Sequence, residues 1–565
     1  MAAVLDPPTR STADGEPLPP PESAEPVAVP TVGGVVEGVA ATLLRPRVLA
    51  RETLHLGREL AAILRGTDEI EPAADKRFAD PAWTSNPAYR RLGQSYLALG
   101  SSLTRLIDRY EADGGDWHDV ERARFAVNAL TSAISPTNTL LGNPAAIKRA
   151  WDTGGRSVVR GLSHLVEDLR HNGGMPTQTD RSAFTVGRDL GVTRGSVVYR
   201  DDVIELIQYG PTTPQVSERP LVIVPPPIGR FYFLDLRPGR SFVEYAVGQG
   251  LQTFMISWRN PTTKQADWDL DTYAERVRRA VGVAREITGS PDVNTLGFCA
   301  GGIVMTTLLN HLAAIGDTSV HSAAYAVTLL DFAERAPLGA FSGRRVIGLA
   351  GRMSRTRGVI SARSMGSTFS WMRPDDLVFN YVVNQWLMGE DPPVFDILAW
   401  NADGTNLPAA LHGQFLQIFR DNTLVAPGAM TVLGTPVDLA SITLPTFVTG
   451  ALTDHLTPWT GCYRTTRLLS GPSTFVLSHS GHIQSLVNPP GNPKAAYWTG
   501  GDAGPDPEDW RATATKHTGS WWESWAPWTV ERSGALVDAP SSLGSALHPP
   551  IEPAPGSYVL DRVPA

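Results

Sequence analysis

Two hydrophobic periodicities divide the chain. From Val35 to Leu169 apolar residues recur at three- and four-residue spacings, as in RETLHLGRELAAILRG and YRRLGQSYLALGSSLTRLIDRYEA, and this spacing predicts amphipathic helices. Another helix is expected from Pro144, because Asn143 is a favourable N-cap and proline suits the first helical position. The sequence therefore predicts a mainly helical N-terminal domain over residues 35–195.

After Gly174 the pattern changes to short β-branched runs. SVVYR and VIELIQY predict a β-hairpin with a turn at Asp201-Asp202. Apolar runs then alternate with helical segments, which predicts a parallel sheet buried on both faces; the runs are PLVIVPPP, LQTFMISW, VNTLGF, AAYAVTLLDF, PTFVTGA and STFVLS. Residues from about 333 to 441 interrupt this rhythm. We expect an α/β domain over residues 196–535, with residues 333–441 inserted as a cap over its active face.

The two ends of the chain are rich in proline, and disorder is expected over residues 1–34 and 536–565. The first 30 residues lack the basic start and apolar run of a signal peptide. No apolar run reaches the roughly 18 residues of a membrane-spanning helix. With only two cysteines in 565 residues there is no disulfide framework and no zinc cluster. A cytoplasmic protein is expected, and its net charge of −8 argues against binding nucleic acid.

The strand VNTLGF leads directly into Cys299. Gly297-Phe298-Cys299-Ala300-Gly301 follows the G-x-S-x-G nucleophile-elbow pattern, with cysteine in place of serine. A strand-to-helix turn of this kind strains the nucleophile and needs small neighbours, and the helix N-terminus favours a thiolate. The backbone N–H of Ala300 is then the first expected oxyanion donor. The alternative is a small buried hydrophobic cysteine, the commoner role of a free cysteine.

The acid and the histidine of such a site follow the nucleophile in that order. Asp454 comes after the strand PTFVTGA, and the loop after STFVLS holds His479 and His482. Either histidine has a suitable position, although His482 follows a glycine and lies further from the strand end. His455 is a weaker candidate for the base, because it directly follows the acid.

A second oxyanion donor is expected in the loop Val224-Pro225-Pro226-Pro227-Ile228-Gly229-Arg230. The three prolines have no N–H, so Ile228 is the first residue that can donate. In the cap, arginines outnumber acids, and Arg373 in WMRPDDL is a candidate to bind phosphates of a substrate. The alternative is that these arginines form a solvated face. The same two readings, a water-excluding layer or the cap's own core, apply to its aromatic residues, Trp371, Phe379, Tyr381, Trp386 and Phe395.

The chain resembles the single-subunit polyhydroxyalkanoate synthases over roughly residues 75–535. The resemblance lies in ordered blocks such as RFADPAW, DTGGRSVVRGL, FYFLDLRP, LGFCAGG, WNADGTNLP, TDHLTPW, SGHIQSLVNPP and GSWWESW. It implies a catalytic Cys299, Asp454 and His482 in an α/β-hydrolase fold with a cap. One departure is visible, because the family's Ile-Asn-Lys is Ile228-Gly229-Arg230 here.

The resemblance implies an acyltransferase that polymerises (R)-3-hydroxyacyl-CoA through a thioester on Cys299 and releases CoA. The coenzyme A thioester is then the substrate, and no cofactor or metal is expected. The expected partners are the growing polyester chain, the surface of polymer granules in the cytoplasm, and a second copy of the chain in a homodimer. His455 and Arg373 are expected near the substrate. The alternatives are a thioesterase or lipase-like hydrolase of the same fold, and a non-catalytic granule protein.

Overall fold

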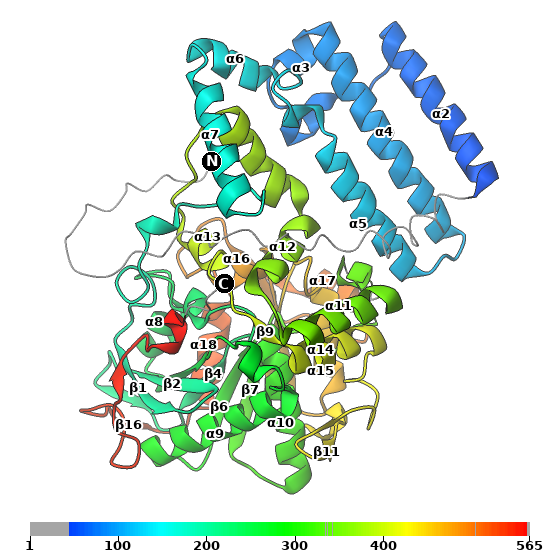
Figure 1. The fold of residues 1–565 in the computed structure, drawn as a ribbon. Coiled ribbons are helices and arrows are strands. Elements are labelled where there is room, and N and C mark those ends of the chain that lie inside the picture. Colours follow the sequence, from blue (N-terminus) through cyan, green and yellow to red (C-terminus); the bar gives the residue numbers. More distant parts are fainter. Residues whose placement is uncertain (1–44, 334, 336, 342, 503, 562–565) are drawn as a thin grey trace.

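The computed structural model describes residues 45–333, 335, 337–341, 343–502 and 504–561 (Figure 1). The expected disorder of residues 1–34 lies outside this part of the chain. The first described segment is helical, with short 3₁₀ turns between its helices: α2 (Pro46–Arg65), α3 (Ala82–Ser85), α4 (Pro87–Ala112), α5 (Trp117–Ala133), α6 (Pro144–Asp152) and α7 (Arg156–His171).

Polar side chains cap the N-termini of α4, α5 and α6, and the cap at Asn143 is the one expected from the sequence. The Asn143 side chain accepts a hydrogen bond from the N–H of Ala146 at the start of α6, as the cap preference predicts. Asn86 caps α4 in the same way, directly before Pro87. Helices α2, α4 and α5 pack side by side (Figure 1), and buried Glu52 of α2 pairs with Arg105 of α4.

An eleven-stranded mixed sheet forms the centre of the second part of the chain. Its order is β15-β14-β13-β12-β7-β6-β4-β5-β2-β1-β17. The six strands from β13 to β5 run parallel, and β2 and β1 form the antiparallel hairpin that the sequence predicts. The strands are β1 (Gly195–Arg200), β2 (Ile204–Tyr209), β4 (Leu221–Val224), β5 (Thr253–Trp258), β6 (Val293–Phe298), β7 (Val320–Ala326), β12 (Thr446–Ala451), β13 (Ser473–Ser478), β14 (Ala496–Thr499), β15 (Thr515–Thr518) and β17 (Glu552–Pro553).

Helices cover both faces of this sheet. One buried apolar cluster includes residues of α9 (Leu270–Thr288), α10 (Ala300–Ile315) and α15 (Trp459–Leu468). The other includes residues of α8 (Phe242–Gly248), α16 (His482–Leu486) and α18 (Trp522–Glu531), with Trp521, Trp522 and Trp525 fully buried. A short helix, α17 (Pro507–Thr513), connects β14 to β15. The central strands are therefore buried on both sides, which explains their uninterrupted apolar sequence.

An insertion separates two strands that pair directly. Strand β7 is hydrogen-bonded to β12, yet about 120 residues of chain lie between them. They form α11 (Arg344–Arg357), β8 (Val359–Ile360), α12 (Ala362–Met372), two π-helical segments (Asp375–Phe379 and Val382–Leu387), α13 (Asp396–Asn401), β9 (Leu407–Pro408), α14 (Ala409–Asp421), β10 (Thr431–Val432) and β11 (Thr435–Pro436). We call this insertion the cap.

The cap is bound to the N-terminal helices. Gly161 of α7 lies so close to the cap that an added Cβ would be 2.0 Å from the Trp386 carbonyl oxygen. Arg335 forms ion pairs with Glu111 and Glu121 of α4 and α5. The N-terminal helices therefore pack on the cap, as the cyan helix α7 does beside the green cap helices in Figure 1.

The expectation of disorder over residues 536–565 is wrong for its described part. Strand β16 (Leu536–Asp538) pairs with β3 (Gln215–Ser217), and β17 pairs with β1 at the edge of the large sheet. Proline is compatible with an edge strand, because its missing N–H can face away from the ladder. The N–H groups of Ile551 and Ala554 on either side of β17 bond to the carbonyls of Val197 and Gly195. The segment is thus fixed by backbone pairing that its composition does not reveal.

None of the helices in the described part of the chain has both the length and the hydropathy needed to cross a membrane. No group of three or more His, Cys, Asp or Glu side chains among the described residues is arranged to hold a metal ion.

Candidate active site

Cys299 lies at the sharp turn between β6 and α10. Its backbone has φ 49° and ψ −125°, a left-handed conformation that is strained for a side chain with a Cβ. Its N–H donates to Ala326 O (2.9 Å), and its carbonyl accepts from the Thr328 hydroxyl (3.1 Å). The strained conformation is therefore held by the neighbouring strand β7 and the residues after it.

The glycines of the elbow are required by close packing. A Cβ on Gly297 would lie 2.6 Å from Gly302 Cα, and one on Gly301 would lie 2.3 Å from Val224 O. A Cβ on Gly302 would meet the Thr328 hydroxyl at 2.2 Å. The G-x-C-x-G-G run is thus explained by contacts across the turn with β4 and with the segment after β7.

Asp454 follows β12 and has both carboxylate oxygens fully engaged. Oδ1 accepts the N–H groups of Leu456 (2.8 Å) and Thr457 (3.0 Å), and Oδ2 accepts the Thr457 hydroxyl (2.7 Å). Burial by itself would raise the pKa of Asp454, but the charge of His482 and the hydrogen bonds from His482 and Thr457 bring that pKa below its ordinary value. The carboxyl is therefore held as an oriented anion.

His482 is the first residue of α16, and its ring lies between Asp454 and Cys299. Nδ1 is 2.6 Å from Asp454 Oδ2 and 3.2 Å from the Thr457 hydroxyl, which leaves Nε2 for its hydrogen bond with the Cys299 side chain. Burial would lower the pKa of His482, but Asp454 and Cys299 raise it well above its ordinary value. The structure thus brings together the three residues that the sequence selected.

The two other histidines near the acid and the base have different surroundings. His479 stacks on Trp498 with ring centroids 6.0 Å apart, and its backbone continues the pairing of β13 with β14. His455 is half-buried, and its pKa is lowered by burial first and further by the positive charges of Arg373 and His482, against the opposing charge of Asp454. The charges of Asp454, Arg373 and His482 therefore all act on His455.

The loop after β4 packs on the elbow. Gly301 touches the carbonyls of Val224 and Pro225, and Val224 pairs with Gly297 in the sheet. Gly229 N–H is engaged, since it donates to the Thr405 hydroxyl (2.8 Å). In the described part of the chain neither Ile228 N–H nor Ala300 N–H has an acceptor. Both N–H groups chosen from the sequence are thus unpaired.

The cap arginines and aromatic residues differ in their contacts and exposure. Arg373 is half-exposed and pairs with Asp376 (2.6 Å), whereas Arg335 is bound to the N-terminal helices. Trp386 donates from Nε1 to Asp168 of α7 (2.8 Å), and Phe395 is 45% exposed with Arg240 over its ring. Trp386 thus contacts the N-terminal helix α7, and Phe395 contacts Arg240.

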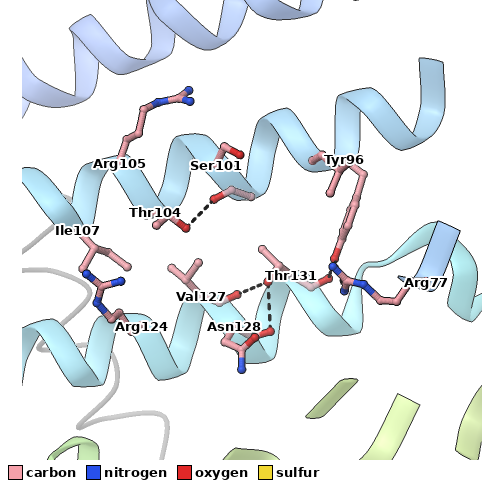
Figure 2. A pocket seen from close by; sticks show the side chains of 12 residues that line it. Arg77, Tyr96, Ser101, Thr104, Arg105, Ile107, Arg124, Val127, Asn128 and Thr131 are labelled. Carbon is pink, nitrogen blue, oxygen red and sulfur yellow. Dashed lines mark hydrogen bonds between the residues drawn. The ribbon is translucent and has the colours of Figure 1, made fainter. Parts of the chain in front are cut away.

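A separate hollow of about 560 Å³ lies between α4 and α5 (Figure 2). Its three arginines are paired with acids: Arg77 with Asp75 (2.6 Å), Arg105 with Glu52 (2.6 Å) and Arg124 with Asp108 (2.7 Å). Since every guanidinium is already neutralised, this hollow has no excess charge for an anionic ligand.

Sequence reasoning missed Thr457, Thr405 and Arg230. The hydroxyl of Thr457 touches both Asp454 and His482, and its position three residues after the acid was the available signal, because Asp side chains often bond to the N–H two or three residues on. The segments that contain Thr405 and Arg230 contact each other across 170 positions or more. No local sequence pattern predicts such a contact between distant segments.

The chain is similar to known polymerases over most of its length. The N-terminus of poly-beta-hydroxybutyrate polymerase (PhaC) matches residues 74–246, and the alpha/beta hydrolase fold matches residues 238–489. Poly(3-hydroxyalkanoate) polymerase 1 of Ectopseudomonas oleovorans is 46% identical over 529 residues, covering 93% of this chain and 94% of that protein. Poly(3-hydroxyalkanoate) polymerase subunit PhaC of Cupriavidus necator is 42% identical over 495 residues, covering 86% and 83%.

Among solved structures, a monoacylglycerol lipase of Paleococcus ferrophilus aligns with 58% of this chain and 99% of its own, at 14% identity and a TM-score of 0.33. The match to the alpha/beta hydrolase model, together with the observed sheet, confirms the α/β-hydrolase fold expected from the sequence.

Proposed function

Because the chain belongs to the poly(3-hydroxyalkanoate) polymerase family, we propose that it is an acyltransferase that polymerises (R)-3-hydroxyacyl-CoA and releases CoA. One observation carries the proposal. His482 is buried between the Asp454 carboxylate and the Cys299 side chain, and Cys299 sits at a strained strand-to-helix turn. This is the arrangement of an activated nucleophile, its base and the group that orients the base.

Acylation begins at the sulfur of Cys299. His482 Nε2 takes the thiol proton, and the thiolate attacks the thioester carbonyl to form a tetrahedral oxyanion. The N–H groups of Ala300 and Ile228 are the proposed donors to that oxyanion. When the carbon–sulfur bond to CoA breaks, the proton on His482 passes to the CoA sulfur, and the acyl group remains on Cys299 as a thioester. One thioester replaces another, so the acyl group stays activated for transfer.

Elongation requires a 3-hydroxyl group as the second nucleophile. His482 takes the proton from the 3-hydroxyl of an incoming acyl-CoA while that oxygen attacks the acyl thioester on Cys299. The Cys299 sulfur leaves and takes the proton back from His482, and the lengthened acyl-CoA can then acylate Cys299 again with release of CoA. Asp454 supports this step by orienting His482. Direct proton removal by Asp454 is disfavoured, because its two oxygens already accept four hydrogen bonds and its pKa is lowered.

No bound cofactor or metal has a role in this chemistry, since the proposed nucleophile, base and oxyanion donors all belong to the chain. The proposed partners are the acyl-CoA, the growing polyester, the granule surface and a second copy of the chain. Association with an apolar granule is supported by α6 and α7, which expose a row of apolar side chains: Ile147, Trp151, Val159, Leu162, Val166 and Leu169. Granule residence would place the protein in the cytoplasm at the polymer surface.

The test is an assay of the purified chain with (R)-3-hydroxybutyryl-CoA. CoA release is followed with a thiol reagent, and the acyl product is separated into sedimenting polymer and free 3-hydroxybutyrate. The proposal predicts CoA release matched by polymer. Release matched by free acid would instead identify a hydrolase, and no release across short and medium acyl chains would identify a non-catalytic protein.

A further inference from the structure

Arg230 lies directly after the oxyanion loop and is almost completely buried, with 4% of its surface exposed. Its guanidinium reaches the carboxyl-terminal segment, where Nη1 donates to Tyr558 O (3.1 Å) and Nη2 donates to Asp561 O (2.7 Å). Its Nε lies 3.3 Å from Asp403 Oδ1 in the cap. One side chain therefore joins the loop, the cap and the carboxyl-terminal segment.

The cap holds the same loop from its other side. Trp400 Nε1 donates to Arg230 O (2.7 Å), and the Thr405 hydroxyl donates to Pro227 O (2.9 Å) while accepting from Gly229 N–H (2.8 Å). Gly229 has φ +104°, and a Cβ there would lie 3.1 Å from the Trp400 ring. The loop backbone is thus shaped by contacts from outside.

The carboxyl-terminal segment is itself anchored to the sheet. Ser557 Oγ and Tyr558 N–H both donate to Glu205 of β2 (3.0 Å each), and the Tyr558 hydroxyl donates to the Asp201 carbonyl. Glu205 is fully buried and also accepts from Arg200 Nε (2.8 Å). The segment that supplies the two carbonyl acceptors of Arg230 is therefore itself held by β1 and β2.

These contacts matter because the loop has no regular structure of its own. Three of its residues are prolines, and Ile228 N–H must keep its direction while having no acceptor in the described structure. An oxyanion donor works only when it is held at the right position beforehand. The Arg230 side chain anchors the backbone two residues after Ile228, so it is well placed to hold Ile228 N–H in position.

We propose that Arg230 is a positioning residue, which ties the carboxyl-terminal segment 557–561 and the cap to the oxyanion loop and so fixes the direction of Ile228 N–H toward the acyl group on Cys299. The inference rests on the proposed function, because it assigns a role in acylation. It also assigns a positioning role to residues 557–561, which touch none of Cys299, Asp454 and His482 in the described contacts.

The experiment compares two reactions of Cys299 in a Cys462→Ser background. Acylation by 3-hydroxybutyryl-CoA needs the oxyanion donors, whereas alkylation by iodoacetamide is a direct displacement of iodide by the thiolate and needs none. The variants are Arg230→Gln, Arg230→Lys and a chain ending at Gly556. Arg219→Gln is the matched control, because Arg219 is also mostly buried, pairs with an aspartate (Asp292) and donates to a backbone carbonyl (Arg532), but it lies before the amino end of β4.

In Arg230→Gln and in the shortened chain, the kcat for acylation should fall by roughly 10- to 100-fold with KM little changed, since small misplacements of a catalytic group have effects of this size. The alkylation rate and its pH profile should match the parent. Arg230→Lys should recover part of the acylation rate, because lysine keeps the charge beside Asp403 and has N–H donors for the carbonyls. Arg219→Gln should acylate at the parent rate.

Two results would overturn the inference: parent acylation in both Arg230→Gln and the shortened chain, or an equal loss of acylation and alkylation in a folded Arg230→Gln. If circular dichroism shows that the shortened chain does not fold, the inference is tested by comparing Arg230→Gln with Arg230→Lys. An equal loss of acylation rate in these two variants would contradict the inference. The parent protein tests the proposed function separately, because absence of CoA release there would refute the acyltransferase itself.

Discussion

Replacing Asp454 with asparagine should reverse the hydrogen bond that orients His482. The two backbone N–H groups of Leu456 and Thr457 point at Oδ1, so an asparagine must place its carbonyl oxygen there. Its NH₂ group then occupies the Oδ2 position, 2.6 Å from His482 Nδ1. Because NH₂ only donates, Nδ1 must accept, and the imidazole proton moves to Nε2. A protonated Nε2 in a neutral ring has no lone pair for the Cys299 proton.

The expected loss is large. A base held in the wrong tautomer costs about 10⁴-fold in kcat in a triad of this geometry. The carboxylate charge is also the first of the influences that raise the pKa of His482, so the pH at which His482 loses its proton should fall in the variant. Stopped-flow measurement of the first stoichiometric CoA release gives the rate, and the pH profile of Cys299 alkylation by iodoacetamide gives the shift.

Thr457→Val is the matched control for this variant. It removes the hydroxyl that touches Asp454 and His482 but keeps the carboxylate and the backbone donors. Since one hydrogen bond contributes about 1 kcal/mol, its effect on acylation should be about tenfold or less. Acylation in folded Asp454→Asn at a rate as close to the parent as that of Thr457→Val would refute the tautomer argument.

Three further outcomes are expected. His482→Gln should abolish the first CoA release in stopped flow, whereas His455→Gln should be milder; normal release in the first and none in the second would reverse their roles. Cys462→Ser should leave turnover unchanged, because Cys462 is fully buried in α15, where its Sγ lies 3.7 Å from the Thr457 carbonyl oxygen, and serine differs from it by one atom. Burial lowers the pKa of His412 from 6.5 to about 4, so the unfolded chain takes up this proton first as the pH falls, and roughly 3 kcal/mol of stability should be lost between pH 6.5 and 4. Denaturant unfolding should show a smaller acid loss in His412→Gln, and an equal loss would contradict the assignment.

The sequence was sufficient for the central strands of the sheet and for the elbow because these are locally encoded, whereas it did not predict the edge strands β14, β15 and β17. The runs VNTLGF, PTFVTGA and STFVLS coincide with β6, β12 and β13. A parallel strand buried on both faces must be continuously apolar, and the turn after β6 must have glycine where β4 and Thr328 approach. The order of nucleophile, acid and base along the chain then follows from the fold.

Contacts between distant segments could not be predicted in this way. The ordered carboxyl-terminal segment depends on Glu205 and Arg230, which lie more than 300 residues earlier. The ion pairs of Arg335 likewise depend on Glu111 and Glu121 of the N-terminal helices, which lie far away in the sequence. A proline-rich composition or a run of arginines indicates how a segment would behave in isolation. Contacts with distant residues determine whether that segment is ordered and whether its charges are paired.

In the proposed reaction Cys299 carries the acyl group. Intact-protein mass spectrometry, after rapid mixing with one equivalent of (R)-3-hydroxybutyryl-CoA and quenching in acid, detects such an intermediate. One acyl adduct is expected, mapped by proteolysis to the peptide containing Cys299, absent from a folded Cys299→Ala variant and retained in Cys462→Ser. An adduct that persists in Cys299→Ala, or polymer formation by that variant, would contradict this role of Cys299.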